Sequence, residues 1–196
     1  MSISPDRALL RSELRAARRA IPAPQRIAAA DALAHRLLTL PFAPSSGHVA
    51  GYWAMDGEIA LHRWQVTLPP EVQYCLPVLH AEKQLRFAPW RPGDALVTNR
   101  YGIPEPAVDS TDALLPQAMS LVVMPMVGFD DAGNRLGMGG GWYDRSFATR
   151  RHDAPPPWLV GVGFALQRLA HLELAAWDVK PDAICTETHT LLASIA

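Results

Sequence analysis

Apolar side chains in the first forty residues recur with the period of an amphipathic helix. The pattern predicts a helix over 6–20, whose apolar face consists of Leu10, Leu14, Ala17 and Ile21. Pro22 and Pro24 interrupt it, and Pro24 suits the first turn of a second helix over 25–40. The N-terminal part of the chain is therefore predicted to be a pair of helices.

Beyond residue 47 the pattern changes to short apolar runs rich in β-branched and aromatic residues, which predict strands. These strands are expected at 48–53, 71–78, 85–90, 121–124, 158–164 and the end of 177–187. Further helices are predicted just after the Asp56–Gly57 turn and at 143–151 and 166–174. A rigid proline turn is predicted at 101–106, and 107–119 is read as a linker with a short helix at most. Strands alternating with helices predict an α/β fold, a three-layer α/β/α sandwich with a largely parallel sheet.

Composition narrows the class of protein without identifying a chemistry. The 196 residues are 49% hydrophobic and 19% charged, with a net charge near −1, which fits one domain spanning 1–196 and no general nucleic-acid binding. No apolar run approaches the ~20 residues that a membrane-spanning helix needs, and the start lacks signal-peptide character. Cys75 and Cys185 have no metal-ligand spacing. The expectation is a cytoplasmic enzyme or binding protein without nucleic-acid or membrane partners.

The stretch 121–145 combines features that suit anion binding. A buried strand ends at Pro125, a turn-rich loop follows, and Arg135 precedes four glycines in the five positions 137–141. Glycines let the backbone approach an oxyanion, and a helix start at Trp142 would add free N–H groups. The alternative is a flexible surface loop, and neither the P-loop nor the dinucleotide-binding glycine pattern fits.

Two further groups of charged residues have both a structural and a functional interpretation. Arg7, Arg11, Arg15 and Arg18 form a stripe on the first helix, either a solvated basic flank or a cationic edge facing phosphates. Glu58 follows the predicted strand that contains Tyr52. It either favours a helix dipole or offers a carboxylate to N–H donors of a ligand.

The string Arg135-Leu136-Gly137-Met138-Gly139-Gly140-Gly141-Trp142-Tyr143-Asp144-Arg145, preceded by Met124-Pro125 and Gly128-Phe129-Asp130, resembles the signature of 5-formyltetrahydrofolate cyclo-ligases. Collinear segments extend the resemblance over nearly the whole chain. They are the arginines of the first helix, Tyr52 with Glu58, Gly102–Pro106, Asp178–Asp182 and Thr186–Glu187.

The resemblance implies ATP-dependent cyclisation of 5-formyltetrahydrofolate to 5,10-methenyltetrahydrofolate, with release of ADP and phosphate, through a phosphorylated formyl (iminium phosphate) intermediate. It implies ATP and Mg²⁺ as cofactors, a folate substrate that can be polyglutamylated, and a monomer or weak homodimer. The alternatives are a non-catalytic paralogue that binds folate or nucleotide, and an unrelated sugar-phosphate or CoA-type enzyme on a similar fold.

The resemblance also implies a set of site residues. Arg135 and Tyr143 are the expected catalytic residues. The expected ATP-binding residues are Arg7, Arg11, Arg135, Leu136, Gly137, Met138, Gly139, Gly140, Gly141, Trp142 and Tyr143. The expected folate-binding residues are Tyr52, Glu58, Met138, Gly139, Gly140, Gly141 and Trp142.

Asp144 and Asp178 are the expected Mg²⁺ ligands. The alternatives are that Asp144 caps its helix, that Asp178 closes a turn, and that Asp182 takes the place of Asp178. The chain departs from the family pattern where many members carry lysine at Arg7, and lysine or a larger residue at Met138 and Gly140, so its affinity for ATP stays open.

Overall fold

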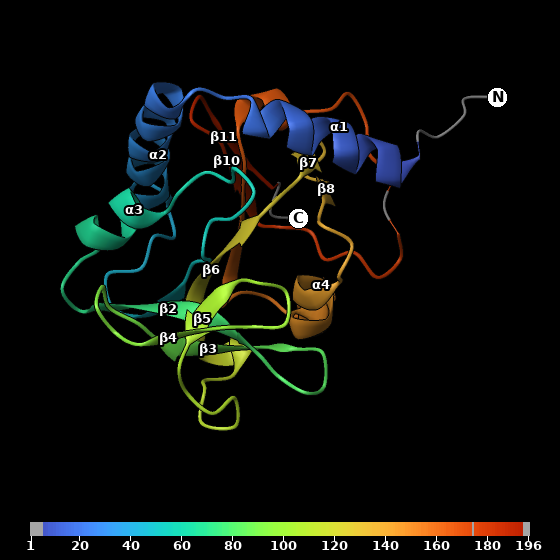
Figure 1. Ribbon diagram of the computed structural model, residues 1–196. Coiled ribbons are helices and arrows are strands. Elements are labelled where there is room, and N and C mark those ends of the chain that lie inside the picture. The colour runs from blue at the N-terminus through green and yellow to red at the C-terminus, as the bar shows by residue number, and fades with distance from the viewer. Residues whose placement is uncertain (1–5, 174, 194–196) are drawn as a thin grey trace.

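The computed structural model describes residues 6–173 and 175–193 and is built around a seven-stranded sheet (Figure 1). The strand order is β11-β10-β9-β6-β1-β2-β3. The five central strands run parallel: β10 (Ala183–Cys185), β9 (Trp158–Val162), β6 (Met119–Pro125), β1 (Gly47–Ala50) and β2 (Val72–Leu79). Only the edge strands are antiparallel: β11 (Thr190–Leu192) and β3 (Leu85–Pro89). The prediction of a largely parallel sheet is confirmed.

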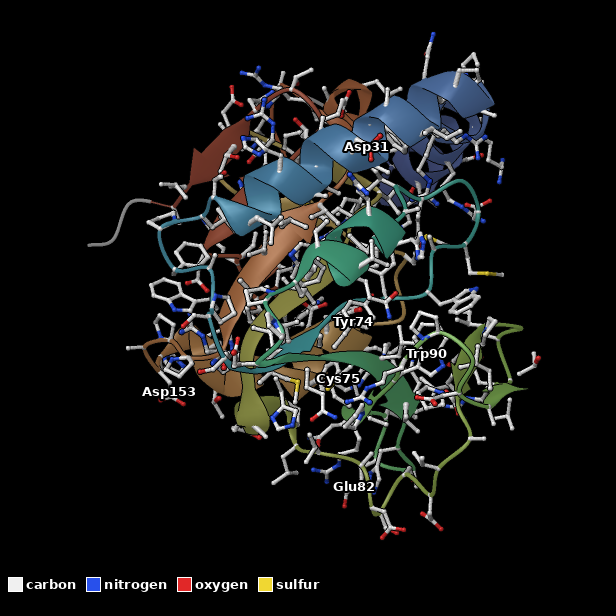
Figure 2. All side chains as sticks on the ribbon, turned by 90° about the vertical axis from the view of Figure 1, so that its left-hand side faces the viewer. Asp31, Tyr74, Cys75, Glu82, Trp90 and Asp153 are labelled. Carbon is white, nitrogen blue, oxygen red and sulfur yellow. The ribbon has the colours of Figure 1, made fainter. Side chains whose placement is uncertain are left out.

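Helices cover both faces of this sheet, as the three-layer prediction required. Helices α2 (Ala23–Leu38) and α3 (His62–Thr67) lie in front of the strands in Figure 2, with Tyr74 beneath them. Leu33 and Trp64 from these helices share one core cluster with strand residues such as Val123. On the opposite face Phe147, at the end of α4 (Trp142–Ser146), packs with alternate strand residues including Val122, and the short helix η2 (Ala148–Arg151) follows. Because successive side chains of a strand point to opposite faces, the sheet contributes to two separate cores, one on each face.

Helix α1 (Arg7–Arg19) lies over the end of the sheet, beside β7 (Gly128–Phe129) and β8 (Arg135–Leu136) (Figure 1). Its first turn is capped because the side chain of Asp6 accepts the backbone N–H of Ala8 at 2.9 Å. Leu14 packs in a separate cluster with Val127, Leu136 and Leu172. The predicted apolar face therefore holds the helix against the segment that carries the glycines.

The predicted helix over 166–174 is wrong. Only η3 (Ala165–Gln167) is helical there, and Leu174 lies outside the described residues. The backbone N–H of Leu169 bonds to the carbonyl of Phe129 at 2.7 Å, and that of Leu172 bonds to the Asp130 carboxylate at 2.8 Å. Because the 129–134 turn takes these donors, they are not free for a helical ladder.

Other boundaries also differ from prediction. The stretch 101–106 is not a simple turn, because β5 (Pro104–Pro106) pairs with β4 (Leu96–Thr98) in a small ribbon. The loop over 129–134 closes a short hairpin between β7 and β8. The predicted helix over 143–151 changes from α4 to the 3-10 helix η2 at Phe147, and the strand over 48–53 ends at Ala50. The linker contains only the short helix η1 (Pro116–Ala118), as expected. Within the described ranges, no helix combines the length and apolarity needed to cross a membrane.

Candidate active site

A cavity of about 480 Å³ opens where β1, β2 and β6 end. In the sheet β1 has β2 on one side and β6 on the other. The cavity therefore sits at the point where the order of the strands reverses. Such a point is where open α/β sheets bind ligands. Four segments supply most of the lining: the start of α1, residues 52–58 after β1, the stretch 135–144, and residues 177–178.

The first helix brings two arginines to this cavity. Arg11 donates from Nε to the carbonyl of Gly137 at 2.8 Å, and Arg7 forms an ion pair with Asp178 at 3.4 Å. Burial, and then the charge of Arg7, lower the pKa of Arg11, although an arginine stays protonated at neutral pH. The helix is therefore attached to the glycine-rich segment through a cation that also faces the cavity.

The glycines between 137 and 141 lie close to neighbouring side chains. A Cβ on Gly141 would lie 2.6 Å from Nη1 of Arg145, and one on Gly140 would lie 2.9 Å from Cδ1 of Trp142, so neither position has space for a side chain unless a neighbour shifts. Gly139 has φ +95°, a conformation that side chains disfavour. Helix α4 has only five residues, and its N-cap Gly141 makes no side-chain cap, so its dipole is small. Arg7, Arg11 and Arg135, more than the start of α4, therefore make this part of the cavity positive.

Arg135 and Asp144 form a buried ion pair at the edge of this loop. The side chain of Arg135 is only 5% exposed, and its Nη2 contacts Oδ1 of Asp144. Its Nε donates to the carbonyl of Val179 at 3.0 Å, while the N–H of Val179 donates to the same Asp144 oxygen at 3.1 Å. The guanidinium is thus held by two partners, Asp144 and the Val179 carbonyl, whose residues are hydrogen-bonded to each other, and Arg135 still lines the cavity.

The two predicted metal ligands both line the cavity but are engaged by protein donors. Oδ2 of Asp178 accepts the N–H of Ala175 at 3.0 Å, so Asp178 does close a turn, and the same oxygen pairs with Arg7. Asp144 does not cap α4, contrary to the structural alternative, because its Oδ1 bonds to Arg135 and Val179 instead.

Each carboxylate keeps one oxygen that accepts no hydrogen bond from residues 6–173 or 175–193, namely Oδ2 of Asp144 and Oδ1 of Asp178. Asp182 instead pairs with Arg150 at 2.7 Å and accepts the N–H of Leu159, and it does not line the cavity. Groups of three or more His, Cys, Asp or Glu side chains suited to a metal do not occur within the described ranges.

Tyr52 and Glu58 reach the cavity from the segment after β1. The Tyr52 hydroxyl donates to the carbonyl of Ile59 at 2.6 Å, and Oε2 of Glu58 accepts the N–H of Met55 at 3.0 Å. Burial raises the pKa of Glu58, while the Met55 N–H and the charge of Arg18 oppose that rise. The helix-dipole alternative for Glu58 is wrong, because α3 begins only at His62.

Of the predicted residues, only Leu136 is not brought to the cavity. Its side chain is fully buried beneath α1, where it packs against Leu14 and Val127. Tyr143 does line the cavity, and burial, then the charge of Glu58, raise the pKa of its phenol well above its usual value. Tyr143 is therefore neutral at physiological pH and can act as a hydrogen-bond donor.

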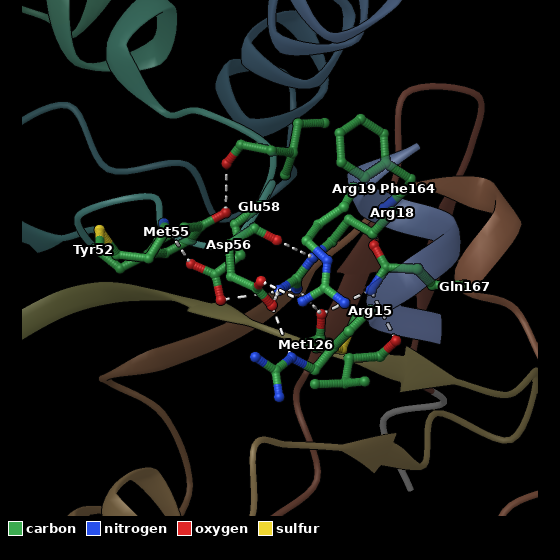
Figure 3. Close-up of polar contacts among 12 residues, drawn as sticks. Arg15, Arg18, Arg19, Tyr52, Met55, Asp56, Glu58, Met126, Phe164 and Gln167 are labelled. Atoms are coloured by element: carbon green, nitrogen blue, oxygen red, sulfur yellow. Dashed lines mark hydrogen bonds and ion pairs between the residues drawn. The ribbon is translucent and has the colours of Figure 1, made fainter. Parts of the chain in front are cut away.

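Sequence reasoning missed several residues that shape the cavity. Tyr101 lies edge-on to Trp142 with ring centroids 6.1 Å apart, and Trp177 is a largely exposed part of the lining. The buried Arg18 and the partly exposed Asp56 form an ion network beside Glu58 (Figure 3). Arg18 was expected on a stripe that is either solvated or faces phosphates, and only its spacing of four residues from the buried Leu14 indicates that it turns inward.

Comparisons with known proteins point to one family. A family model described as the 5-formyltetrahydrofolate cyclo-ligase family matches residues 3–187. The chain is 33% identical over 177 residues to a 5-formyltetrahydrofolate cyclo-ligase of Escherichia coli (strain K12), covering 88% of this chain and 96% of that protein. It is 31% identical over 173 residues to the enzyme of the same name from Haemophilus influenzae, covering 87% and 91%. It also resembles the solved 5,10-methenyltetrahydrofolate synthetase of Aquifex aeolicus, with a TM-score of 0.81 and 26% identity over 97% of this chain and 94% of that one.

Proposed function

The chain belongs to the 5-formyltetrahydrofolate cyclo-ligase family, and we propose that its cavity carries out the ATP-dependent cyclisation of 5-formyltetrahydrofolate to 5,10-methenyltetrahydrofolate. One observation carries the assignment of this cavity: the α1 arginines and the glycine-rich loop share it with Tyr52 and Glu58. A triphosphate needs cations and free backbone donors, whereas a pterin edge needs a carboxylate acceptor. Both requirements are met within one space.

In the proposed reaction the formyl oxygen attacks the γ-phosphorus of ATP. An O–P bond forms, the bond to the β-phosphate oxygen breaks, and ADP leaves. The 10-nitrogen then attacks the formyl carbon, the C–O bond breaks with release of phosphate, and the nitrogen loses its proton. Neither step needs a nucleophilic side chain. The protein mainly has to orient two substrates and stabilise moving negative charge.

We assign the triphosphate to the positive part of the cavity, formed by Arg7, Arg11, Arg135 and the glycines 137–141. Arg135 is the best placed to act on the transferring phosphoryl group, because its guanidinium is buried and held by Asp144 and Val179. A charge fixed in advance stabilises a transition state without reorganisation. Tyr143, a neutral phenol in the same lining, is assigned as a hydrogen-bond donor to the reacting formyl group.

We assign the pterin to the carboxylate of Glu58, next to Tyr52. The aminopyrimidinone edge of a pterin carries N–H donors, and a carboxylate accepts two such bonds side by side. The rings of Trp142 and Tyr101 lie on the cavity wall and offer apolar surface to the rest of the folate. This arrangement would place the formyl group between Glu58 and the arginines.

The family implies Mg²⁺, and two of the acidic residues that line the cavity, Asp144 and Asp178, fit it. Asp144 and Asp178 each keep one carboxylate oxygen without a hydrogen bond from the described residues. Mg²⁺ is held in nucleotide sites by one or two carboxylates together with phosphate oxygens and water. When bound, the ion would neutralise charge on the phosphates. Arg7 and Arg135 would continue to orient the two carboxylates.

The proposed activity is tested by mixing the purified protein with ATP, Mg²⁺ and 5-formyltetrahydrofolate and following the absorbance of the methenyl product. The expected result is product formation that requires ATP and yields one phosphate for each ring closed. Binding of 5-formyltetrahydrofolate without turnover, at any ATP concentration, would favour the non-catalytic paralogue. Absence of folate binding would overturn the proposal for this cavity.

Replacing Glu58 with glutamine is expected to weaken binding of 5-formyltetrahydrofolate by about 1.5–3 kcal/mol, the range for hydrogen bonds to charged groups. The amide is similar in size to the carboxylate but cannot accept two N–H bonds side by side. Calorimetric titration without ATP measures the change. Glu71→Gln, which removes an exposed carboxylate, is the control and should bind like the parent. Unchanged affinity in Glu58→Gln would remove Glu58 from the substrate site.

Replacing Arg11 with methionine is expected to raise the KM for ATP about tenfold or more, the effect of losing one charge-assisted contact of about 1.5–3 kcal/mol. Affinity for folate without ATP should stay within about twofold, because a contact confined to the phosphates does not act on the pterin. Arg63→Gln removes a charge from an exposed ion pair with Asp31 and is the control. An unchanged KM for ATP would assign Arg11 only to the attachment of α1 through Gly137.

A further inference from the structure

Arg18 is the largest fully buried side chain among the described residues, although it is charged. Its guanidinium lies between α1, the turn over 55–58 and the end of β6 (Figure 3). Nη2 pairs with Oδ2 of Asp56 at 2.9 Å, and Nε donates to the Asp56 carbonyl at 3.1 Å. Nη1 approaches the carbonyl of Met126 at 3.5 Å and Oε1 of Glu58 at 3.7 Å. A buried cation of this kind is stable only when it is paired on several sides.

The turn that carries Glu58 is held against α1 by its neighbour Asp56. Three arginines of α1 contact the Asp56 carboxylate: Arg15 at 2.7 Å, Arg18 at 2.9 Å and Arg19 at 2.8 Å. The backbone is equally close, because a Cβ on Gly57 would lie 3.3 Å from Cα of Arg19. Burial alone would raise the pKa of Asp56, but the hydrogen bonds from Arg15 and Arg19 and the arginine charges hold it well below its usual value. Asp56 is therefore a permanent anion between Glu58 and the helix.

Glu58 is oriented without its acceptor sites being used up. Among residues 6–173 and 175–193, only the Met55 N–H donates a hydrogen bond to its carboxylate, on Oε2. Arg18 stands 3.7 Å from Oε1, which is ion-pair distance but longer than a hydrogen bond. Arg18 therefore supplies charge to Glu58 while the lone pairs that face the cavity remain free for N–H donors of a ligand. Glu58 lines the cavity and Arg18 does not.

We propose that Arg18 is a positioning residue for substrate recognition: it holds the Glu58 carboxylate ionised and aimed into the cavity. The inference rests on the proposed function, in which Glu58 binds the pterin. The ionisation of Glu58 is then set by Arg18, a residue that touches no substrate. Arg18 reaches Met126, whose carbonyl also accepts Nε2 of Gln167 at 2.8 Å, so the guanidinium is fixed independently of the ligand.

The charged and titratable groups that face Glu58 come from three elements. They are Arg15 and Arg18 on α1, Tyr52 and Asp56 on its own segment, and Tyr143 on α4. Burial raises the pKa of Glu58, Asp56 adds to that rise, and the two arginines oppose it. An ionised Glu58 is needed to accept two N–H bonds, so affinity is present above its pKa and is lost as pH falls through it. Removing Arg18 must move this loss to higher pH, and removing the charge of Asp56 must move it to lower pH.

The test is a titration of 5-formyltetrahydrofolate binding to the full chain from pH 4 to pH 8, without ATP. Arg18→Gln is expected to raise the midpoint of the acid loss by about one pH unit, which lowers affinity about tenfold below the midpoint. Arg18→Lys, which keeps the charge, should return the midpoint toward that of the parent. Arg19→Gln also removes an arginine from Asp56 but carries no ion pair to Glu58, and should shift the midpoint far less.

Asp56→Asn keeps the proposal testable if Arg18→Gln does not fold, because it is expected to move the midpoint in the opposite direction. Opposite shifts from two variants cannot arise from a general loss of structure. Equal midpoints in the parent, Arg18→Gln and Arg18→Lys would overturn the inference, and so would an unshifted midpoint in Asp56→Asn. Failure of the parent itself to bind 5-formyltetrahydrofolate would instead overturn the proposed function.

Discussion

Replacing Arg135 with alanine is expected to lower kcat about 10²–10³-fold, the effect of removing one preorganised donor from a transition state. Affinity for 5-formyltetrahydrofolate without ATP should change by less than about twofold. The reason is that the proposed function assigns Arg135 to the phosphates, where its charge matters most while the phosphoryl group moves. Its guanidinium is 5% exposed and fixed by Asp144 and Val179. Water that fills the space in the alanine variant therefore does not replace this fixed positive charge.

The measurement is single-turnover kinetics at saturating ATP, with folate affinity determined separately. Arg150→Ala is a matched control, because Arg150 forms an equally buried pair with Asp182 away from the cavity, with side chains 7% and 20% exposed. Both variants should lose stability, but only Arg135→Ala should lose turnover per folded molecule. Equal kcat in the two variants would show that Arg135 only supports the loop.

Short-range patterns predicted the elements that carry this site. The period of apolar residues located α1 and α2, and the apolar runs located the strands of the parallel sheet. The prediction failed at 166–174 because the donors of Leu169 and Leu172 bond to Phe129 and Asp130, about forty residues earlier. A sequence window contains no information on such distant acceptors, so local apolar spacing there indicated a helix.

The sequence indicated most of the residues that line the cavity, but not the contacts that hold them. The string 135–145 placed the glycines and Arg135 in one segment, and the structure adds that Arg7 meets Asp178 across 171 positions of the chain. Arg18 was missed because an arginine is ordinarily on the surface, and only its partners Asp56 and Glu58 make its burial possible. Buried charge is decided by tertiary pairing, which residue spacing alone does not show.

Replacing Asp144 with asparagine is expected to act on stability and on metal requirement at once. The amide still accepts the Val179 N–H but leaves the buried Arg135 without an anion, so unfolding should become easier by about 2–3 kcal/mol, below the 3–5 kcal/mol for full loss of a buried partner. Asp182→Asn weakens the corresponding pair with Arg150 and should cost a similar amount. Denaturant unfolding of both variants measures this part.

The two variants should separate when Mg²⁺ is titrated. Mg²⁺ prefers carboxylate oxygens, and Asp144→Asn removes the charge from an oxygen that accepts no hydrogen bond within the described residues. The Mg²⁺ concentration for half-maximal activity should therefore rise about tenfold or more in Asp144→Asn, the effect of about 1.4 kcal/mol, and stay unchanged in Asp182→Asn. The rise in melting temperature caused by ATP with Mg²⁺, compared with ATP alone, should shrink only in Asp144→Asn. If both titrations overlay that of the parent, Asp144 is not a metal ligand and its role is to hold Arg135 in place.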